Sequence, residues 1–322
     1  MLLESKSEKY YHCRIPGIVC TEKNSLLAYY ECRKSDSDWA EIDIKIIRST
    51  DKGRNWTTAK IIEANGNTLN NPVMITNNGI IHLLYCENYK RIFHSVSEDD
   101  GLNWSVPVEI SYATKNIQHT VVATGPGHGI VTPDGAMVVP VWFAYNKEDK
   151  LSHHPSFIGT LYSKDGGKQW HTGEIIESDF LKDPSECALA LLNDGSVVMS
   201  IRNEDECHQR CFAKSRNGYE NWKIIGFDDR FSDPVCQGSM ANGENIICHI
   251  NCDSKTDRKN LTLKVSDDDF KTFKAIKIDN CGGYSDLCVI NNTTYIIYED
   301  TTDTKEAYYV ELKFTKSDFS TQ

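Results

Sequence analysis

Three arginines lie at the ends of short apolar runs, where they could bind an acidic ligand. Arg14 lies within residues 13–19, Arg202 ends the run 196–202, and Arg258 opens the run 258–265. A guanidinium group presents its N–H donors in a planar fork that matches a carboxylate. If the fold brings these three side chains to one point, they would form a cationic site for a small acid.

Each arginine also has a simpler interpretation as a surface charge. Arg210 competes with Arg202 because it too precedes a turn motif, and only the spacing favours Arg202. Arg258 lies beside Lys255 and Lys259, so it could belong to a solvated basic cluster. The choice depends on the architecture that positions these residues.

A repeated motif predicts that architecture. The pattern Ser-x-Asp-x-Gly-x-x-Trp begins at Ser49, Ser97 and Ser163, and degenerate copies begin at Ser215 and Ser266. The intervals are 48, 66, 52 and 51 residues, and this period of about 54 divides the 322-residue chain into about six units. Ser and Asp side chains can bond nearby backbone amides, Gly can adopt positive φ, and the aromatic ring can pack into a sheet. The motif therefore indicates a structural turn, and we do not expect its acidic residues to be catalytic.

Short strand-like runs surround these turns, and no amphipathic helix of three turns is evident. The runs cover residues 43–47, 80–85, 136–141, 196–200 and 294–298, and tight-turn pairs lie at 78–79, 134–135 and 194–195. Four-stranded units with this period favour an all-β, six-bladed β-propeller of antiparallel blades. A β-sandwich with decorated hairpins is the alternative, which the long fixed period disfavours. Residues 1–322 are predicted to form a single propeller domain.

Composition excludes several classes of protein. With 39% hydrophobic and 10% aromatic residues, the chain can bury a core, so disorder is not expected. No apolar run approaches the length of a membrane span, and the N-terminus lacks the apolar core of a secretory signal. We therefore expect no membrane insertion and a cytoplasmic location, or a secreted one if a leader has been removed. A net charge of −11 argues against nucleic acid as a partner but allows a local cationic pocket. The oligomeric state is left open.

No metal or cofactor site is predicted. The closest pairs among the twelve cysteines, Cys207/Cys211 and Cys248/Cys252, have no matching pair at zinc-site spacing. The histidines show no metal-binding spacing, and Gly-Pro-Gly-His-Gly at 125–129 lacks the Lys-Ser/Thr of a phosphate loop. We expect the cysteines to be reduced and mostly buried, with a disulfide framework as the alternative.

Several segments, in order along nearly the whole chain, resemble the exo-sialidase (neuraminidase) family of six-bladed propellers. The repeated turns resemble that family's Asp boxes, which other propellers also carry. More specific are Arg-Ile-Pro at 14–16, the strand-like run 26–33 that ends in Glu-x-Arg, and Gly-Pro-Gly-His-Gly-Ile at 125–130. Gly-Tyr-Ser-Asp-Leu at 283–287 and Tyr-Glu at 298–299 resemble the family's nucleophile strand and its closing Tyr-Glu.

The resemblance implies a set of substrate-binding residues. Three arginines would hold the substrate carboxylate, a glutamate would orient the first of them, and a fourth arginine would line the pocket. In that order these are Arg14, Arg202 and Arg258, then Glu299, then Arg33.

The resemblance also implies three catalytic residues: Tyr284 as nucleophile, Glu186 as its proton acceptor and Asp38 as acid/base. A sialoside carries a carboxylate on its anomeric carbon, so a neutral phenol can approach where a carboxylate nucleophile would be repelled. A phenol with a pKa of about 10 is a weak nucleophile, so Glu186 would take its proton during attack. Asp38 would protonate the leaving oxygen and then deprotonate water, and the two displacements would retain the anomeric configuration.

Alternatives stay open for several of these residues. Asp36 and Asp43 compete with Asp38 for the acid/base role, Tyr284 could be a core aromatic, and Glu186 could be a solvated turn residue. The predicted function is a retaining exo-α-sialidase that acts on sialylated glycans or free sialosides without a cofactor. The alternatives are a glycosidase for a related 2-keto-3-deoxy acid, a transglycosylating sialidase, and a non-catalytic sialic-acid-binding propeller.

Overall fold

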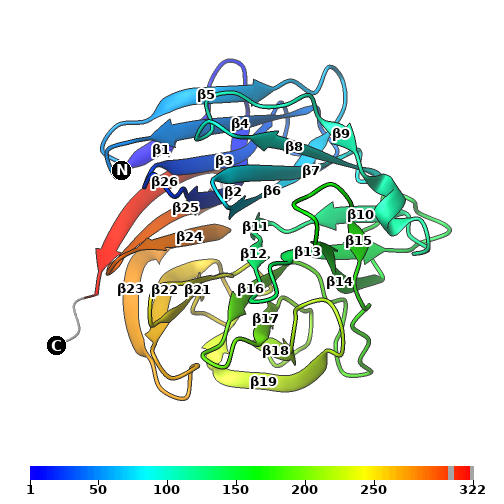
Figure 1. Cartoon of the computed structure of the whole chain (residues 1–322), viewed down its shortest axis with the longest axis vertical. Coiled ribbons are helices and arrows are strands. Elements are labelled where there is room, and N and C mark those ends of the chain that lie inside the picture. The colour runs from blue at the N-terminus through cyan, green and yellow to red at the C-terminus, as the bar shows by residue number, and fades with distance from the viewer. Residues whose placement is uncertain (304–307, 320–322) are drawn as a thin grey trace.

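Six small β-sheets form a ring in the computed structural model, which describes residues 1–303 and 308–319 (Figure 1). Within these residues the only helical segment is the 3₁₀ turn η1 (Ser111–Thr114). None of the described segments forms a helix with the length and apolarity needed to cross a bilayer. The prediction of an all-β, six-bladed propeller is confirmed.

The first three blades each begin near the axis and run outward. The first blade contains β2 (His12–Cys20), β3 (Leu26–Arg33), β4 (Ile42–Ser49) and β5 (Thr57–Ile62). The second contains β6 (Leu69–Asn77), β7 (Ile80–Glu87), β8 (Arg91–Ser97) and β9 (Val108–Glu109), with β11 (Gly127–His128) added to β6. The third contains β10 (Val121–Thr124), β12 (Ile130–Val131), β13 (Met137–Ala144), β14 (Ser156–Ser163) and β15 (His171–Thr172).

The last three blades follow the same plan with four strands each. The fourth contains β16 (Cys187–Leu191), β17 (Val197–Ile201), β18 (Gln209–Ser215) and β19 (Lys223–Ser232). The fifth contains β20 (Ser239–Asn242), β21 (Ile247–Cys252), β22 (Lys259–Ser266) and β23 (Lys274–Cys281). The sixth contains β24 (Ser285–Ile290), β25 (Thr293–Asp303), β26 (Tyr308–Asp318) and, outermost, β1 (Leu2–Glu4).

The additional strands of the second and third blades come from one crossing segment that the sequence did not predict. After β10 the chain turns at Gly125 and Gly127, whose φ angles of 63° and 90° favour glycine. A Cβ at Gly125 would lie 2.2 Å from a methyl carbon of Val73, so a larger residue would not fit there. The chain pairs in parallel with β6 as β11 and then returns to β13 as β12.

Each copy of the repeated motif forms the turn between the third and fourth strands of a blade. In the second copy the Ser97 hydroxyl donates to Asp99 (2.9 Å) and accepts from the backbone N–H of Gly101 (2.9 Å). The Asp99 carboxylate accepts from the backbone N–H of Asn103 (2.7 Å), and Gly101 has a φ of 83°. The motif stabilises a turn, as its composition predicted.

The N-terminal strand closes the ring. β1 pairs with β26, so the first residues of the chain complete the last blade, and the two terminal strands lie side by side (Figure 1). The Glu4 carboxylate of this strand accepts hydrogen bonds from the Tyr30 hydroxyl (2.9 Å) and the Lys45 ammonium (2.5 Å) of the first blade. Side-chain contacts thus link the first and sixth blades beyond the strand pairing.

The core lies between neighbouring blades. One hydrophobic cluster joins Ile18 and Leu26 of the first blade to Tyr295 and Leu312 of the sixth. The second strands are buried on both faces, so a run such as Leu26–Arg33 is buried throughout and shows no alternation. Outer strands such as β5 are largely exposed.

The aromatic position of the repeated turn allows a test of this packing. Trp170 in the third copy is fully buried, whereas Trp104 in the second is only partly buried. We expect Trp170→Ala to lower the free energy of unfolding by about 3–5 kcal/mol, because it leaves a cavity in the core. Trp104→Ala is the matched control and should cost less, as measured by urea denaturation. Equal losses in the two variants would contradict this account of the turns.

Candidate active site

The predicted site residues come together at one end of the ring because they lie at the ends of β-hairpins. Glu186 precedes β16 and Arg202 follows β17, and the Arg202 N–H donates to the Glu186 carbonyl (3.4 Å). Tyr284 precedes β24, and the N–H of Glu299 in β25 donates to the Tyr284 carbonyl (2.8 Å). The sequence spacing within each pair is therefore the length of one hairpin.

These hairpin ends surround a cavity of about 190 Å³. Among the residues that line it are Arg14, Arg33, Asp38, Glu186, Arg202, Arg258 and Tyr284. Glu299 is fully buried behind Arg14. A larger groove of about 1030 Å³ runs along the turns that contain Asp134 and Asp194, but it gathers none of these residues, so volume alone does not mark the site.

The Tyr284 hydroxyl lies between the carboxylate of Glu186 and the guanidinium group of Arg202. Its hydroxyl donates to Glu186 Oε1 (2.6 Å) and accepts from Arg202 Nη1 (2.8 Å). Arg202 Nη1 also donates to the other carboxylate oxygen of Glu186. Burial, and then the negative charge of Glu186, raise the pKa of Tyr284 well above its ordinary value although nearby arginines oppose the shift. Tyr284 is thus a neutral phenol whose proton already faces a carboxylate.

The three arginines predicted to converge do so around this tyrosine. The guanidinium carbons of Arg14 and Arg258 each lie 5.3 Å from the centroid of the Tyr284 ring, and Arg202 contacts its hydroxyl. They come from the first, fifth and fourth blades, respectively. This cluster of positive charge can bind a carboxylate next to the phenol.

Glu299 holds the first arginine in place. Its carboxylate accepts from Nε and Nη2 of Arg14 (both 3.2 Å) and from the backbone N–H groups of Ile15 (2.9 Å) and Tyr284 (3.2 Å). Burial alone would raise the pKa of Glu299, but Arg14, Arg258 and the Ile15 N–H together outweigh it and hold the pKa below its usual range. Glu299 is therefore a buried carboxylate that joins the first blade to the sixth.

A strained backbone turns Arg14 toward the cavity. Ile15 has a φ of 55°, a conformation that β-branched residues rarely adopt, and the pairing of β2 with β3 is irregular between Arg14 and Gly17. Such strain costs roughly 1–3 kcal/mol and persists only where surrounding contacts maintain it. The hydrogen bond from the Ile15 N–H to Glu299 is one of these contacts.

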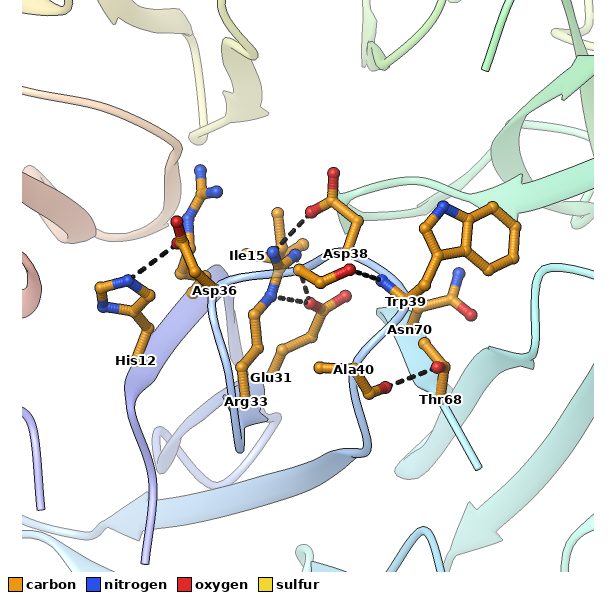
Figure 2. A network of polar contacts seen from close by, with 12 residues as sticks. His12, Ile15, Glu31, Arg33, Asp36, Asp38, Trp39, Ala40, Thr68 and Asn70 are labelled. Atoms are coloured by element: carbon orange, nitrogen blue, oxygen red, sulfur yellow. Dashed lines mark hydrogen bonds and ion pairs between the residues drawn. The ribbon is translucent and has the colours of Figure 1, made fainter. Parts of the chain in front are cut away.

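Asp38 lies at the mouth of the cavity on the connection between β3 and β4. Its carboxylate accepts from Arg33 Nη1 (2.5 Å), while Nε and Nη2 of Arg33 donate to Glu31 (2.9 and 2.7 Å). Figure 2 shows Arg33 between these two carboxylates. Burial alone would raise the pKa of Asp38, but Arg33, together with Arg14 and His153, outweighs it and holds that pKa below its usual range.

The residues that competed for these positions lie elsewhere. Asp36 turns away from the cavity, and its carboxylate accepts a hydrogen bond from Nε2 of the His12 ring (3.0 Å; Figure 2). Asp43 accepts hydrogen bonds from the Tyr10 hydroxyl and the Ala64 N–H, outside the cavity lining. Arg210 is fully buried, where it donates to Ser200, Asp233 and the Cys236 carbonyl.

The comparisons with known proteins agree with this geometry. The model of the family described as 'BNR repeat-like domain' matches residues 24–297 of the chain. The chain belongs to this family.

Its curated relatives include sialidases. That of Bacteroides fragilis is 26% identical, covering 93% of this chain and 62% of the relative, and that of Clostridium perfringens is 27% identical, covering 91% and 87%. Among solved structures, the Hadza microbial sialidase Hz136 shares the fold with a TM-score of 0.80 at 23% identity, covering 97% of this chain and 66% of that one. This chain thus spans less than two thirds of the Bacteroides protein. The resemblance to the exo-sialidase family is confirmed.

This BNR-repeat propeller has an aromatic cavity wall that the sequence analysis missed. Tyr89, Trp142 and His153 line the cavity, with ring centroids of His153 at 5.1 Å from Tyr89 and 5.3 Å from Trp142. Trp39, which follows Asp38, packs on Tyr89 at 4.6 Å. No spacing in the sequence relates these residues, because they come from different blades and connections.

Glu31 also belongs to the site, although the sequence was not interpreted in that way and a signal was present. It is fully buried, binds Arg33 and also accepts from the Asn71 N–H (2.8 Å). In the Glu-x-Arg sequence, alternation along a strand places both side chains on one face. That spacing indicates that Glu31 orients Arg33.

One group at the rim could be considered as a metal site. Ligand atoms of His154, Asp183 and Glu204 lie within 4.8 Å of one another. Asp183 approaches Nδ1 of the His154 ring (3.7 Å) and Glu204 approaches Nε2 (3.6 Å). Because the carboxylates face opposite nitrogens, this is a histidine held between two acids rather than three ligands that converge on one ion.

The buried pair of Glu299 and Arg14 allows a test by pH. Glu299→Gln should lower the free energy of unfolding by about 3 kcal/mol at neutral pH, because it leaves Arg14 without its charged partner. Since the folded-state pKa of Glu299 is depressed, this contribution is present above the ordinary value of 4.5 and is lost as pH falls through the folded pKa. Urea denaturation between about pH 7 and about pH 3 should show the wild-type advantage shrinking in the acid range. An advantage that stays constant with pH would contradict the assigned ion pair.

Proposed function

We propose that this protein is a retaining exo-α-sialidase that hydrolyses terminal sialic acid from glycoconjugates. The observation that carries the proposal is the 2.6 Å contact between the Tyr284 hydroxyl and Glu186 within a cluster of three arginines. A phenol paired with a carboxylate suits a substrate whose reacting carbon bears a negative group. The names of the curated relatives, which are sialidases, support the same activity.

In this proposal the arginines place the substrate. Glu299 occupies Nε and Nη2 of Arg14, and this bidentate contact fixes the plane of the guanidinium group beside the phenol ring. Arg202 and Arg258 approach the same tyrosine from other blades. A sugar carboxylate held by these groups puts the anomeric carbon, to which it is attached, next to the Tyr284 hydroxyl.

Tyr284 then attacks that carbon while Glu186 takes its proton. The raised pKa of Tyr284 means that the phenol stays neutral until attack, so it does not repel the substrate carboxylate. Arg202 contacts both Glu186 and the phenol oxygen, so it holds the proton acceptor next to the nucleophile. The product of this step is a covalent glycosyl-tyrosine, and water then releases the sugar with retained configuration.

Asp38 would supply the proton to the leaving oxygen. Its pKa is depressed because Arg33, together with Arg14 and His153, outweighs the effect of burial. Binding of an anionic sugar beside Arg14 and Arg33 adds negative charge near Asp38 and raises its pKa toward the value that a general acid needs. Turnover should therefore fall as pH rises through the pKa of Asp38 in the complex.

Covalent labelling tests the nucleophile directly. 2,3-Difluorosialic acid should react once with the protein as its C2 fluoride leaves, and mass spectrometry of the digest should place the added sugar on Tyr284. Tyr284→Phe should take no label and should lose about 10³-fold or more in kcat on a fluorogenic sialoside. Full activity in this variant would refute the mechanism. Sialoside binding without turnover by the wild type would indicate a non-catalytic binding propeller instead.

Substrates with different leaving groups test whether Asp38 is the general acid. Asp38→Ala should lower kcat/KM by about 10²–10⁴-fold on a natural sialoside, whose alcohol leaves only when protonated. The loss should be much smaller on an aryl sialoside, because a phenolate leaves without help. Asp36→Ala is the matched control, since this residue belongs to the same connection but faces His12. An equal loss on both substrates would remove Asp38 from the acid role.

A further inference from the structure

A second cavity, of about 230 Å³, lies at the far ends of the inner strands. Tyr284 and Glu186 stand just before the first residues of β24 and β16, whereas Val289 and Leu191, near the other ends of these strands, line the second cavity. The two cavities are thus separated by the length of the inner strands. The second cavity shares no lining residue with the candidate active site.

Most of the wall of this second cavity is aliphatic, and all six blades contribute to it. From the first blade to the sixth, one aliphatic lining residue of each is Val19, Ile75, Ile130, Leu191, Ala241 and Val289. Several of the lining side chains are only partly buried, so the cavity is open to a ligand from solvent. Such a wall favours a ligand with an apolar chain, because burial of apolar surface stabilises the complex.

One imidazole interrupts this aliphatic wall. Nδ1 of His128, in β11, lies 2.8 Å from Oδ1 of Asp286, whose carboxylate is fully buried. Because a carboxylate accepts hydrogen bonds and donates none, Nδ1 carries a proton and Nε2 is the ring nitrogen left for a ligand. Nε2 has no hydrogen-bond partner among the residues that the structure describes, and the side chain is 12% exposed.

The carboxylate behind this imidazole is itself held in place. The Ser239 hydroxyl donates to Oδ1 of Asp286 (2.5 Å), and the Ile18 backbone N–H donates to Oδ2 (2.8 Å). Groups from the first, second and fifth blades thus meet on a carboxylate of the sixth, so the imidazole is fixed before a ligand binds. Burial alone would lower the pKa of His128, but Asp286, together with Cys20, outweighs it and raises that pKa above its ordinary value.

We propose that this second cavity binds a short aliphatic carboxylate, with the carboxylate group on Nε2 of His128 and the chain along the aliphatic wall. A protonated imidazole presents one N–H donor to the cavity, which matches a monoanion. A multiply charged anion such as phosphate would leave most of its oxygens without donors against this wall. An aliphatic ammonium ion would be repelled by the imidazolium, so the charge of the ligand should decide binding.

The position of Asp286 indicates how such a ligand would lie. Asp286 follows Tyr284 by two residues and precedes Ile290, the last residue of β24, by four. These separations correspond to about 7 Å and about 13 Å of extended chain. His128, which contacts Asp286, would therefore anchor the carboxylate at the deep end of the cavity, and the chain would point outward. The site does not depend on the proposed sialidase activity.

Isothermal titration calorimetry of the full chain with hexanoate tests this site. The wild type should bind one hexanoate per chain and should bind hexan-1-amine at least 10-fold more weakly. His128→Gln removes the charge from the cavity and should weaken hexanoate binding by roughly 10–100-fold, which corresponds to the loss of one charge-assisted hydrogen bond. Circular dichroism checks that the variant is folded.

Val131→Glu tests the same site without changing His128. Val131 lines the cavity and is partly exposed, so a carboxylate there should repel hexanoate and abolish its binding. Val108→Glu, on the exposed strand β9, is the matched control and should bind like the wild type. Arg258→Ala should also bind like the wild type, because it alters only the other cavity. No hexanoate binding by the wild type, undiminished binding by His128→Gln or Val131→Glu, or lost binding by Arg258→Ala would overturn the proposal.

Discussion

The site depends on one buried carboxylate. Glu299 accepts four N–H donors, two from the Arg14 side chain and one each from the backbones of Ile15 and Tyr284. These donors come from the first and the last blade, so a single ionised group sets the position of an arginine relative to the proposed nucleophile. Its hydrogen bond from the Ile15 N–H also helps to maintain the left-handed backbone conformation next to Arg14. A buried charge of this kind is stable only when every lone pair has a donor, and here the donors are themselves parts of the site.

The register of the hairpins explains how much of the site the sequence predicted. The repeated turn fixes the phase of the blades, and in the fourth and sixth blades the open end of the first hairpin, with Glu186, Arg202 and Tyr284, lies at the cavity. A pair such as Glu186 and Arg202 is therefore separated in sequence by one hairpin length and adjacent in space. Arg202 and Arg210 could be compared on spacing for this reason, and the structure places Arg202 in the cavity lining and Arg210 in the core. Residues at the ends of paired strands follow from register, which is why Glu186, Arg202 and Tyr284 could be located from the sequence.

Residues in connections follow no such rule. Trp39, Tyr89 and His153 meet through packing between blades, which a single sequence does not encode in any spacing. The crossing strand β11 depends on the close approach of Gly125 to Val73, a contact that exists only once both blades have formed. Asp36 and Asp38 differ by two positions on one connection, and only the ion pair with Arg33 distinguishes them. What the sequence could not predict was decided by tertiary contact rather than by local preference.

The net negative charge of the molecule is compatible with a positively charged cavity. A chain of net charge −11 concentrates four guanidinium groups around about 190 Å³. Three of them are anchored by carboxylates: Arg14 by Glu299, Arg33 by Glu31 and Asp38, and Arg202 by Glu186. Each anchor reduces the cost of burying the guanidinium group but consumes only some of its five donors. The remaining donors are already held in place before a ligand binds. Binding of an acidic sugar therefore costs less free energy for ordering the arginine side chains. The acidic surface and the basic cavity are thus compatible, because the carboxylates that make the protein acidic include those that hold its arginines in place.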